Sequence, residues 1–93
     1  MIKHEETGNH GAFFFERADI RLAAMTYSRT TPTLVIIDHT DVSEVLKGQG
    51  MGRQLLDALV AWARQTGTKV MATCPYALAQ FRKDESIRDV FAG

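Results

Sequence analysis

The spacing of hydrophobic residues changes about halfway along the chain. In the first half, short apolar runs alternate with polar turns, which is typical of strands. The runs cover Ala12–Arg17, Ile20–Tyr27 and Leu34–Ile37, and turn-forming residues separate them at 17–19 and 28–33. The first half is therefore predicted to form an antiparallel meander, and a short edge strand near Ile2–Glu6 would extend it.

From residue 50 onward the apolar positions follow the period of an α-helix. One helical face carries Met51, Leu55, Leu59, Trp62 and Ala63. Gly67 is a suitable C-terminal stop, because glycine readily adopts the left-handed conformation that ends many helices. A helix is therefore predicted from Gly50 to about Gly67.

A short buried strand is predicted next, at Lys69–Thr73. Pro75 then suits the first turn of a second helix that runs to about Lys83, with Ala77, Leu78 and Phe81 facing inward. The segment Ser86–Phe91 is expected to form a loose tail.

The strand from Leu34, the helix from Gly50 and the strand from Lys69 together predict a right-handed βαβ crossover with parallel strands. The expected fold class is therefore α+β, with the antiparallel meander joined to a βαβ unit and a second short helix. Because ligands favour the carboxyl end of such strands, the glycines before the first helix, His39 and Cys74 are expected to share a cleft.

Composition limits the partners of the chain. Its 93 residues are 45% apolar, which allows one small domain over residues 1–93. Eleven basic and eleven acidic residues cancel, so neither a nucleic acid nor a membrane is expected as a partner. A single Cys and the lack of a long apolar run predict a cytoplasmic protein without an internal disulfide. A monomer or weak homodimer is expected.

The segment between Leu46 and Leu56 carries Gly48, Gly50 and Gly52 directly before the predicted helix. Glycines there let a backbone approach a ligand closely, and the unpaired N–H groups of the helix start attract an anion. A nucleotide P-loop is excluded because Arg53 and Gln54 stand where lysine and a hydroxyl are needed. The spacing of the glycines also does not match the Gly-x-Gly-x-x-Gly fingerprint of dinucleotide-binding proteins.

Two residues at the predicted strand ends are candidates for catalysis. Cys74 precedes Pro75 and is expected to cap the second helix, where the helix dipole favours a thiolate. His39 would act as a base or orienting group. The structural alternatives are a small buried hydrophobe for Cys74 and a hydrogen-bonded residue for His39. Asp38, Asp41 and Glu44 are alternative bases. His4 and His10 lack metal-ligand spacing, so no metal site is predicted.

Three spaced motifs then resemble one family. Lys47-x-x-Gly50-x-Gly52 resembles the pyrophosphate loop of the GCN5-related N-acetyltransferases (GNATs). In combination with Asp38-His39-Thr40-Asp41-Val42, Ala72-Thr73-Cys74-Pro75-Tyr76 and Phe81-Arg82-Lys83, it is similar to the minimal single-domain members of that family. The chain differs at Lys47, where Arg or Gln is usual, and at 84–87, where members often carry a His-Pro-Glu-Tyr-like segment.

The resemblance implies a trimmed GNAT fold with acetyl-CoA between two splayed parallel strands. It implies catalytic roles for Cys74 and His39, and proton donation to the departing thiolate by Tyr76. The expected cofactor-binding residues are Val45, Leu46, Lys47, Gly48, Gln49, Gly50, Met51, Gly52 and Arg53, with Phe81 and Lys83 at the pantetheine or adenosine end.

The predicted function is an acetyl-CoA-dependent N-acetyltransferase that acts on an unidentified amine. One alternative is a non-catalytic acyl-CoA-binding or interaction module that uses the same loop. Another is a plain α/β module whose glycines only allow a tight start to the helix.

Overall fold

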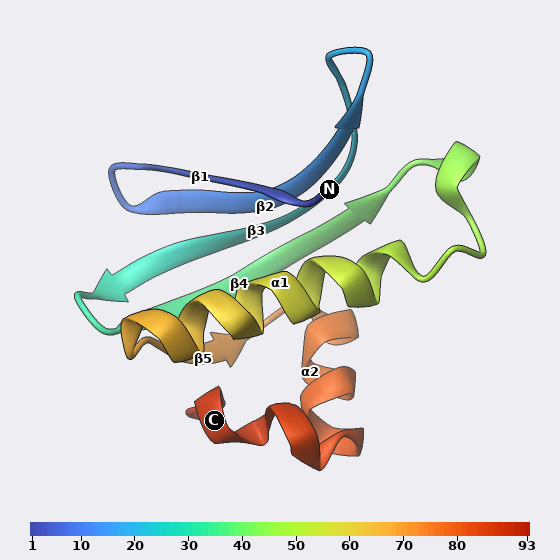
Figure 1. The fold of residues 1–93 in the computed structure, drawn as a ribbon. Helices are drawn as coiled ribbons and strands as arrows, with labels where there is room; N and C mark the ends of the chain where they lie inside the picture. The colour runs from blue at the N-terminus through green and yellow to red at the C-terminus, as the bar shows by residue number, and fades with distance from the viewer.

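The computed structural model describes residues 1–93, which contain one five-stranded sheet in the order β1-β2-β3-β4-β5 (Figure 1). The strands are β1 (Lys3–Thr7), β2 (His10–Arg17), β3 (Ile20–Thr31), β4 (Leu34–Val42) and β5 (Lys69–Ala72). Strands β1 to β4 pair antiparallel, and β5 pairs parallel to β4. The predicted meander, edge strand and βαβ unit are therefore confirmed.

The helices lie where the apolar period and the start and stop residues predict them. Helix α1 spans Met51–Thr66 and ends at Gly67, whose φ of 67° is left-handed. Helix α2 spans Pro75–Lys83, with Cys74 as its N-cap. Two short 3₁₀ helices, η1 (Glu44–Leu46) and η2 (Glu85–Val90), follow β4 and α2.

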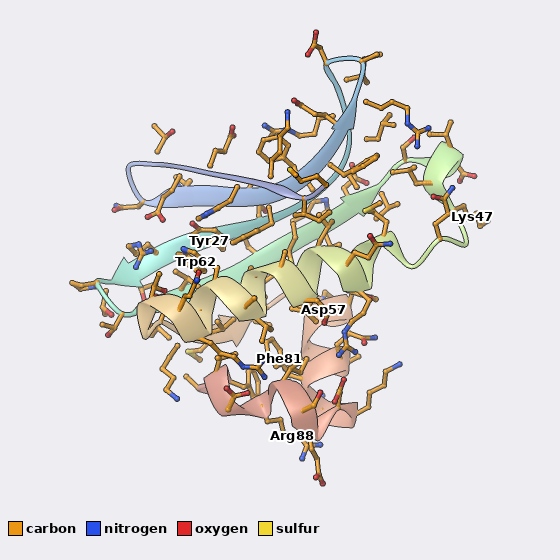
Figure 2. The ribbon with its side chains drawn as sticks, viewed as in Figure 1. Tyr27, Lys47, Asp57, Trp62, Phe81 and Arg88 are labelled. Carbon is orange, nitrogen blue, oxygen red and sulfur yellow. The ribbon has the colours of Figure 1, made fainter.

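All the helices share one core with one face of the sheet. Helix α1 crosses that face of the sheet. Helices α2 and η2 lie beside α1, near β5 (Figures 1 and 2). The fully buried side chains come from both halves of the chain: Met25, Tyr27, Val35, Ile37, Leu46, Leu55, Leu56, Leu59, Val60, Val70 and Phe81. Of the α2 residues predicted to face inward, Ala77 and Phe81 are buried and Leu78 is half-buried.

The segment after α2 is more ordered than the sequence predicts. Instead of a loose tail, it forms η2, which buries Ile87 and Val90. Phe91 stacks on Phe81 with ring centroids 4.5 Å apart and forms a parallel bridge with Val70. The prediction was wrong because three scattered apolar residues show no period until β5 and Phe81 provide a surface for them.

Strand β4 runs beyond the predicted end at His39. The register with β3 pairs Thr26 with His39 and Tyr27 with Ile37, so Asp38 is an extra residue in a β-bulge. The bulge interrupts the apolar alternation, which hides the last three residues of the strand from a sequence reading. Because of the extra residue, Thr40 points to the core-facing side of the sheet, where it pairs with Met25.

At the other end of the sheet, Gly11 lies directly under the Tyr27 ring. A Cβ atom at Gly11 would lie 2.3 Å from Cζ of Tyr27. The Tyr27 hydroxyl donates to Glu6 at 2.8 Å, and Arg29 donates two bonds to the same carboxylate at 2.7 and 3.1 Å. This network joins β1 to β3 across β2.

We expect Gly11→Ala to lower the free energy of unfolding by about 1–3 kcal/mol, because the added methyl group must displace the buried Tyr27 ring. Urea denaturation measures the change. Thr7→Ala, at an exposed position of the same hairpin, is the matched control and should stay within about 0.5 kcal/mol of the unaltered protein. Equal stability of the two variants would contradict the close packing.

The Glu6 network also predicts a pH dependence of stability. Hydrogen bonds from Arg29, helped by Tyr27, lower the pKa of Glu6 from its ordinary value of 4.5 to about 2. A lowered pKa in the folded state stabilises the protein above pH 4.5, and that stabilisation is lost as the pH falls toward about 2. Glu6→Gln should therefore show a smaller loss of stability between pH 6 and pH 3 in urea denaturation. The same loss in both proteins would contradict the ion pair.

Candidate functional site

The site is built around a gap between β4 and β5. Their parallel pairing ends at Ile37 and Ala72, and the N–H groups of Thr73 and Cys74 both donate to the Ile37 carbonyl, at 2.9 and 3.2 Å. Strand β4 continues to Val42, whereas the chain after β5 turns into α2. The last residues of β4 therefore have no strand neighbour on that side.

The glycine segment lies beside this gap, at the start of α1. The backbone N–H groups of Gly48, Gly50, Met51, Gly52 and Arg53 donate no hydrogen bond within the protein, and the first helical bond runs from Gln54 N–H to the Gly50 carbonyl. Gly50 is the N-cap of the helix and has a left-handed φ of 68°. Because the residue there is glycine, no side chain covers these donors. The helix start is therefore an open set of anion-binding donors with partial positive charge.

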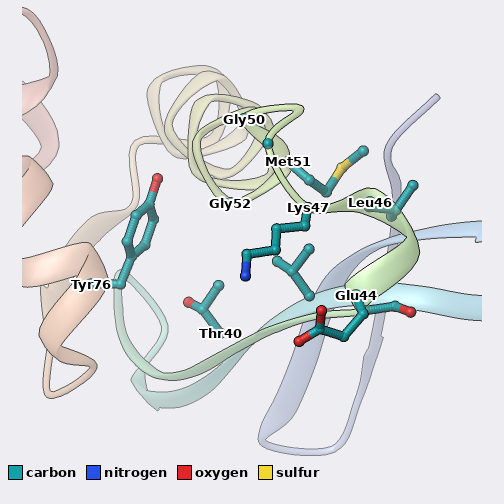
Figure 3. Close-up of a pocket in the computed structure, with 11 residues that line it drawn as sticks. Thr40, Glu44, Leu46, Lys47, Gly50, Met51, Gly52 and Tyr76 are labelled. Atoms are coloured by element: carbon teal, nitrogen blue, oxygen red, sulfur yellow. The ribbon is translucent and has the colours of Figure 1, made fainter.

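A cavity of about 500 Å³ connects the helix start to the gap (Figure 3). Its lining contains six of the predicted cofactor-binding residues, Leu46, Lys47, Gly48, Gly50, Met51 and Gly52. Five further residues complete it: Thr40, Val42, Ser43, Glu44 and Tyr76. Thr40 is not among the predicted site residues, because the Asp38 bulge hides the direction of the side chains at the end of β4.

Tyr76 forms one wall of the cavity, at the first turn of α2 (Figure 3). Its ring lies over Gly52, where a Cβ atom would approach the ring carbons and hydroxyl to 3.2–3.3 Å. Partial burial raises the pKa of Tyr76 above its ordinary value, so the hydroxyl keeps its proton at neutral pH. Gly52 thus brings a phenolic proton donor next to the helix start.

Cys74 lies just behind the cavity wall. Its side chain is 4% exposed, and its Sγ is 3.3 Å from Oγ1 of Thr40, which does line the cavity. The predicted position of Cys74 at the N-cap of α2 is confirmed, although the side chain makes no capping hydrogen bond.

His39 does not join Cys74 and the glycines. Because Thr40 faces the cavity and successive strand residues point to opposite faces, His39 points to the other face of the sheet, where it is exposed. Asp38 and Asp41 are exposed as well, whereas Glu44 lines the cavity. The predicted single cleft is thus divided: the glycines lie on one face of the sheet and His39 on the other.

Arg53 holds the two helices together. Its guanidinium donates to Asp57 at 2.8 Å, to Gln80 at 2.9 Å and to Asp84 at the end of α2. The bond from Arg53 holds the pKa of Asp84 well below its ordinary value. The Arg53 side chain is therefore already occupied by protein partners, and Arg53 does not line the cavity.

The other predicted cofactor residues lie around or away from the cavity. Val45 is 63% exposed on η1, and Gln49 is exposed in the glycine segment. Phe81 is fully buried, so its side chain offers no surface to a ligand. Lys83 is exposed at the end of α2 and does not line the cavity.

Comparison with protein families places residues 12–90 in the family model described as GCN5-related N-acetyl-transferase. The match covers most of the chain, including the glycine segment, the gap and Cys74. The chain therefore belongs to the GCN5-related N-acetyltransferase (GNAT) family. A comparison with curated proteins finds no match.

Solved structures share this fold. A GCN5-like protein from Staphylococcus aureus is 34% identical, with a TM-score of 0.73, and the match covers 98% of this chain and 88% of that one. A GNAT-family protein from Desulfovibrio desulfuricans is 24% identical, with a TM-score of 0.60, over 69% of this chain and 43% of that one. Tetrahymena GCN5 is 11% identical, with a TM-score of 0.66, over 81% of this chain and 49% of that one. The chain thus spans about half of the longer proteins.

Neither α1 nor any other helix has the length and the apolar character that a membrane-spanning segment needs.

Proposed function

We propose that this protein is an acetyl-CoA-dependent N-acetyltransferase acting on an amine. The observation that carries the proposal is the open helix start in a member of the GNAT family: five backbone N–H groups there are unpaired, and four of their residues, Gly48, Gly50, Met51 and Gly52, line a cavity of about 500 Å³. A pyrophosphate needs several convergent donors and no side chains in front of them, and this segment offers both.

The surroundings of the helix start also fit a CoA ester. Cβ atoms added at Gly48 and Gly50 would meet nothing within 4 Å, so the space over the donors is open. Lys47 adds a positive charge at the cavity wall (Figure 3). The apolar Val42, Leu46 and Met51 also line the cavity, and their surface suits an alkyl chain better than a second charged group.

Acetyl-CoA would supply the acetyl group: the amine nitrogen bonds to the thioester carbon while the C–S bond breaks, the amine loses one proton and the thiolate gains one. The residues of the chain would manage those protons. Tyr76 carries a protonated hydroxyl at the cavity wall and serves as the donor to the thiolate. Glu44, which lines the cavity, and His39, which is exposed on the other face of the sheet, are the candidates for accepting the amine proton.

The role proposed for Cys74 has two forms. It either takes the acetyl group covalently or, as an alternative to Tyr76, donates the proton to the thiolate during direct transfer. Because its Sγ lies behind Thr40, covalent transfer requires the Thr40 side chain to move aside. The direct route needs only a hydrogen-bonded path from Cys74 through the Thr40 hydroxyl to the cavity.

A non-catalytic acyl-CoA-binding module is the second candidate function. The observation in its favour is the separation of the two residues that the family resemblance implies in catalysis: Cys74 is buried, and His39 faces the other side of the sheet. Such a module would hold the same ligand without releasing CoA.

Calorimetric titration tests the binding half of the proposal. We expect acetyl-CoA and CoA to bind with micromolar affinity and ADP to bind more weakly, because only CoA derivatives extend from the helix start into the apolar part of the cavity. Lys47→Gln should weaken binding by about threefold to tenfold, since one exposed charge contact is lost. Lys3→Gln, on β1, is the matched control and should bind normally. Failure to bind any CoA ester would overturn the proposal and favour a plain α/β module.

Turnover is tested by the release of free CoA in the presence of primary amines. Tyr76→Phe should lower kcat by about 100-fold or more while acetyl-CoA affinity stays within about twofold, because only proton donation is lost. An unchanged rate in Cys74→Ala would rule out both roles of Cys74. The covalent route would be supported if intact-mass spectrometry detects one added acetyl group on the unaltered protein and none on Cys74→Ala. Tight binding without any CoA release would establish the binding module instead.

A further inference from the structure

The cavity of the proposed site contains an amine that belongs to the chain itself. Lys47, directly before the glycines, lines this cavity. Its side chain points into the cavity, toward Thr40 on β4 (Figure 3). Thr40 lies beyond the last paired residue of β4, beside the gap, and its Oγ1 is 3.3 Å from Sγ of Cys74. The ε-amino group of Lys47 is therefore directed toward the end of the cavity where β4 and β5 separate.

No protein group holds the Lys47 amine in place. The ion pairs of the chain all involve other residues, and no side-chain hydrogen bond includes Lys47. The carboxylate of Glu44 lines the same cavity but forms no ion pair with it. The amine is therefore free to react with a group that enters the cavity.

The other three of the four lysines are placed differently. Lys3 donates to a carboxylate on β2 at 2.6 Å, and Lys69 donates to a backbone carbonyl of η2 at 2.8 Å. Lys83 is exposed at the end of α2 and lies outside the cavity. Lys47 alone combines an unpaired amine with a position inside the proposed site.

A thioester bound in this cavity would meet the Lys47 amine. With the pyrophosphate of a CoA ester on the N–H groups of the helix start, its alkyl arm lies along the apolar lining and its thioester lies toward the gap. The Lys47 side chain points in the same direction, toward Thr40 (Figure 3). An amine held beside a bound thioester reacts at an effective concentration far above that of an amine in solution.

We infer that Lys47 is a site of self-acetylation, at which the chain transfers the acetyl group of bound acetyl-CoA to its own ε-amino group. The inference rests on the proposed function and names one acceptor for it. The Lys47 ammonium first gives a proton to Glu44 or to water. The neutral nitrogen then bonds to the thioester carbon while the C–S bond breaks. The nitrogen loses a second proton, and the thiolate takes one from Tyr76. One acetyl-CoA thus yields one acetyllysine, one CoA and one released proton.

The modification would reduce the affinity of its own site for acetyl-CoA. Acetylation replaces the positive charge of Lys47 with a neutral amide at the cavity wall. The acetylated protein should bind acetyl-CoA about threefold to tenfold more weakly, as expected for Lys47→Gln, because the same charge contact is lost. Self-acetylation is therefore a feedback on the site when acetyl-CoA is abundant and other amines are scarce.

Peptide mapping by mass spectrometry tests the inference on protein incubated with acetyl-CoA and no added amine. Lys47 should be acetylated about tenfold or more faster than Lys83, the matched control, because only the Lys47 amine lies in the site. The first-order rate at Lys47 should not depend on protein concentration, and Tyr76→Phe should lower it without changing the rate at Lys83. In protein unfolded by urea the two lysines should react equally.

Equal rates at Lys47 and Lys83 in the folded protein, a preference that persists in urea, or a rate that rises with protein concentration would overturn the inference. None of these comparisons needs a variant. Hydroxylamine removes an acetyl thioester from Cys74 and leaves the amide on Lys47. The intact-mass comparison for Cys74 therefore counts only the acetyl group that hydroxylamine removes.

Calorimetry on the incubated protein tests the feedback and separates the two possible failures. Incubation should weaken acetyl-CoA binding to the unaltered protein and leave that of Lys47→Arg unchanged, because arginine keeps the charge and is not acetylated. Equal affinity before and after acetylation of Lys47 would overturn the feedback. Acetyl-CoA that binds and acetylates added amines without modifying Lys47 would overturn the inference alone, whereas no binding of any CoA ester would overturn the proposed function as well.

Discussion

The geometry of the site depends on the backbone carbonyl of Ile37. It accepts the N–H groups of both Thr73 and Cys74 and so satisfies two donors at the end of β5. Buried donors need partners, so the chain must stay against β4 up to this carbonyl and can turn away only beyond it. Pro75 then starts α2 without an N–H group to satisfy. The gap is therefore set by main-chain hydrogen bonds, and the side chains around it are free to vary with the chemistry.

Much of the fold could be predicted because its signals are local. The apolar period of α1, the stop at Gly67 and the proline of α2 each act within a few residues, and their elements lie where the sequence predicts them. The end of β4 and the η2 segment could not be predicted in the same way. A bulge at Asp38 reverses the alternation of the strand, and the apolar residues of η2 find their partners on β5 and α2, far away in the sequence.

The same distinction applies to the site. Glycines before a helix indicate an anion-binding segment by themselves, and six of the predicted cofactor-binding residues line the cavity. The contact of Tyr76 with Gly52 and the bonds of Arg53 to Gln80 and Asp84 join segments more than twenty residues apart. No local pattern reports such contacts. The predicted meeting of His39 with Cys74 followed from topology alone, and the direction of the His39 side chain depends on the bulge one residue earlier.

The bonds of Arg53 have a mechanical consequence. One guanidinium links the first turn of α1 to the last turn of α2, the helix that carries Tyr76. The helix start and the Tyr76 wall therefore behave as one rigid unit, and neither can move toward a ligand without the other. The opposite wall, from Ser43 to Lys47, is held by its own short turns, by the Ser43 N–H bond to the Leu22 carbonyl and by the buried Leu46 side chain. Both walls are therefore anchored before a ligand arrives, and adjustment to its shape is left to exposed side chains between the anchors, such as Val45 and Lys47.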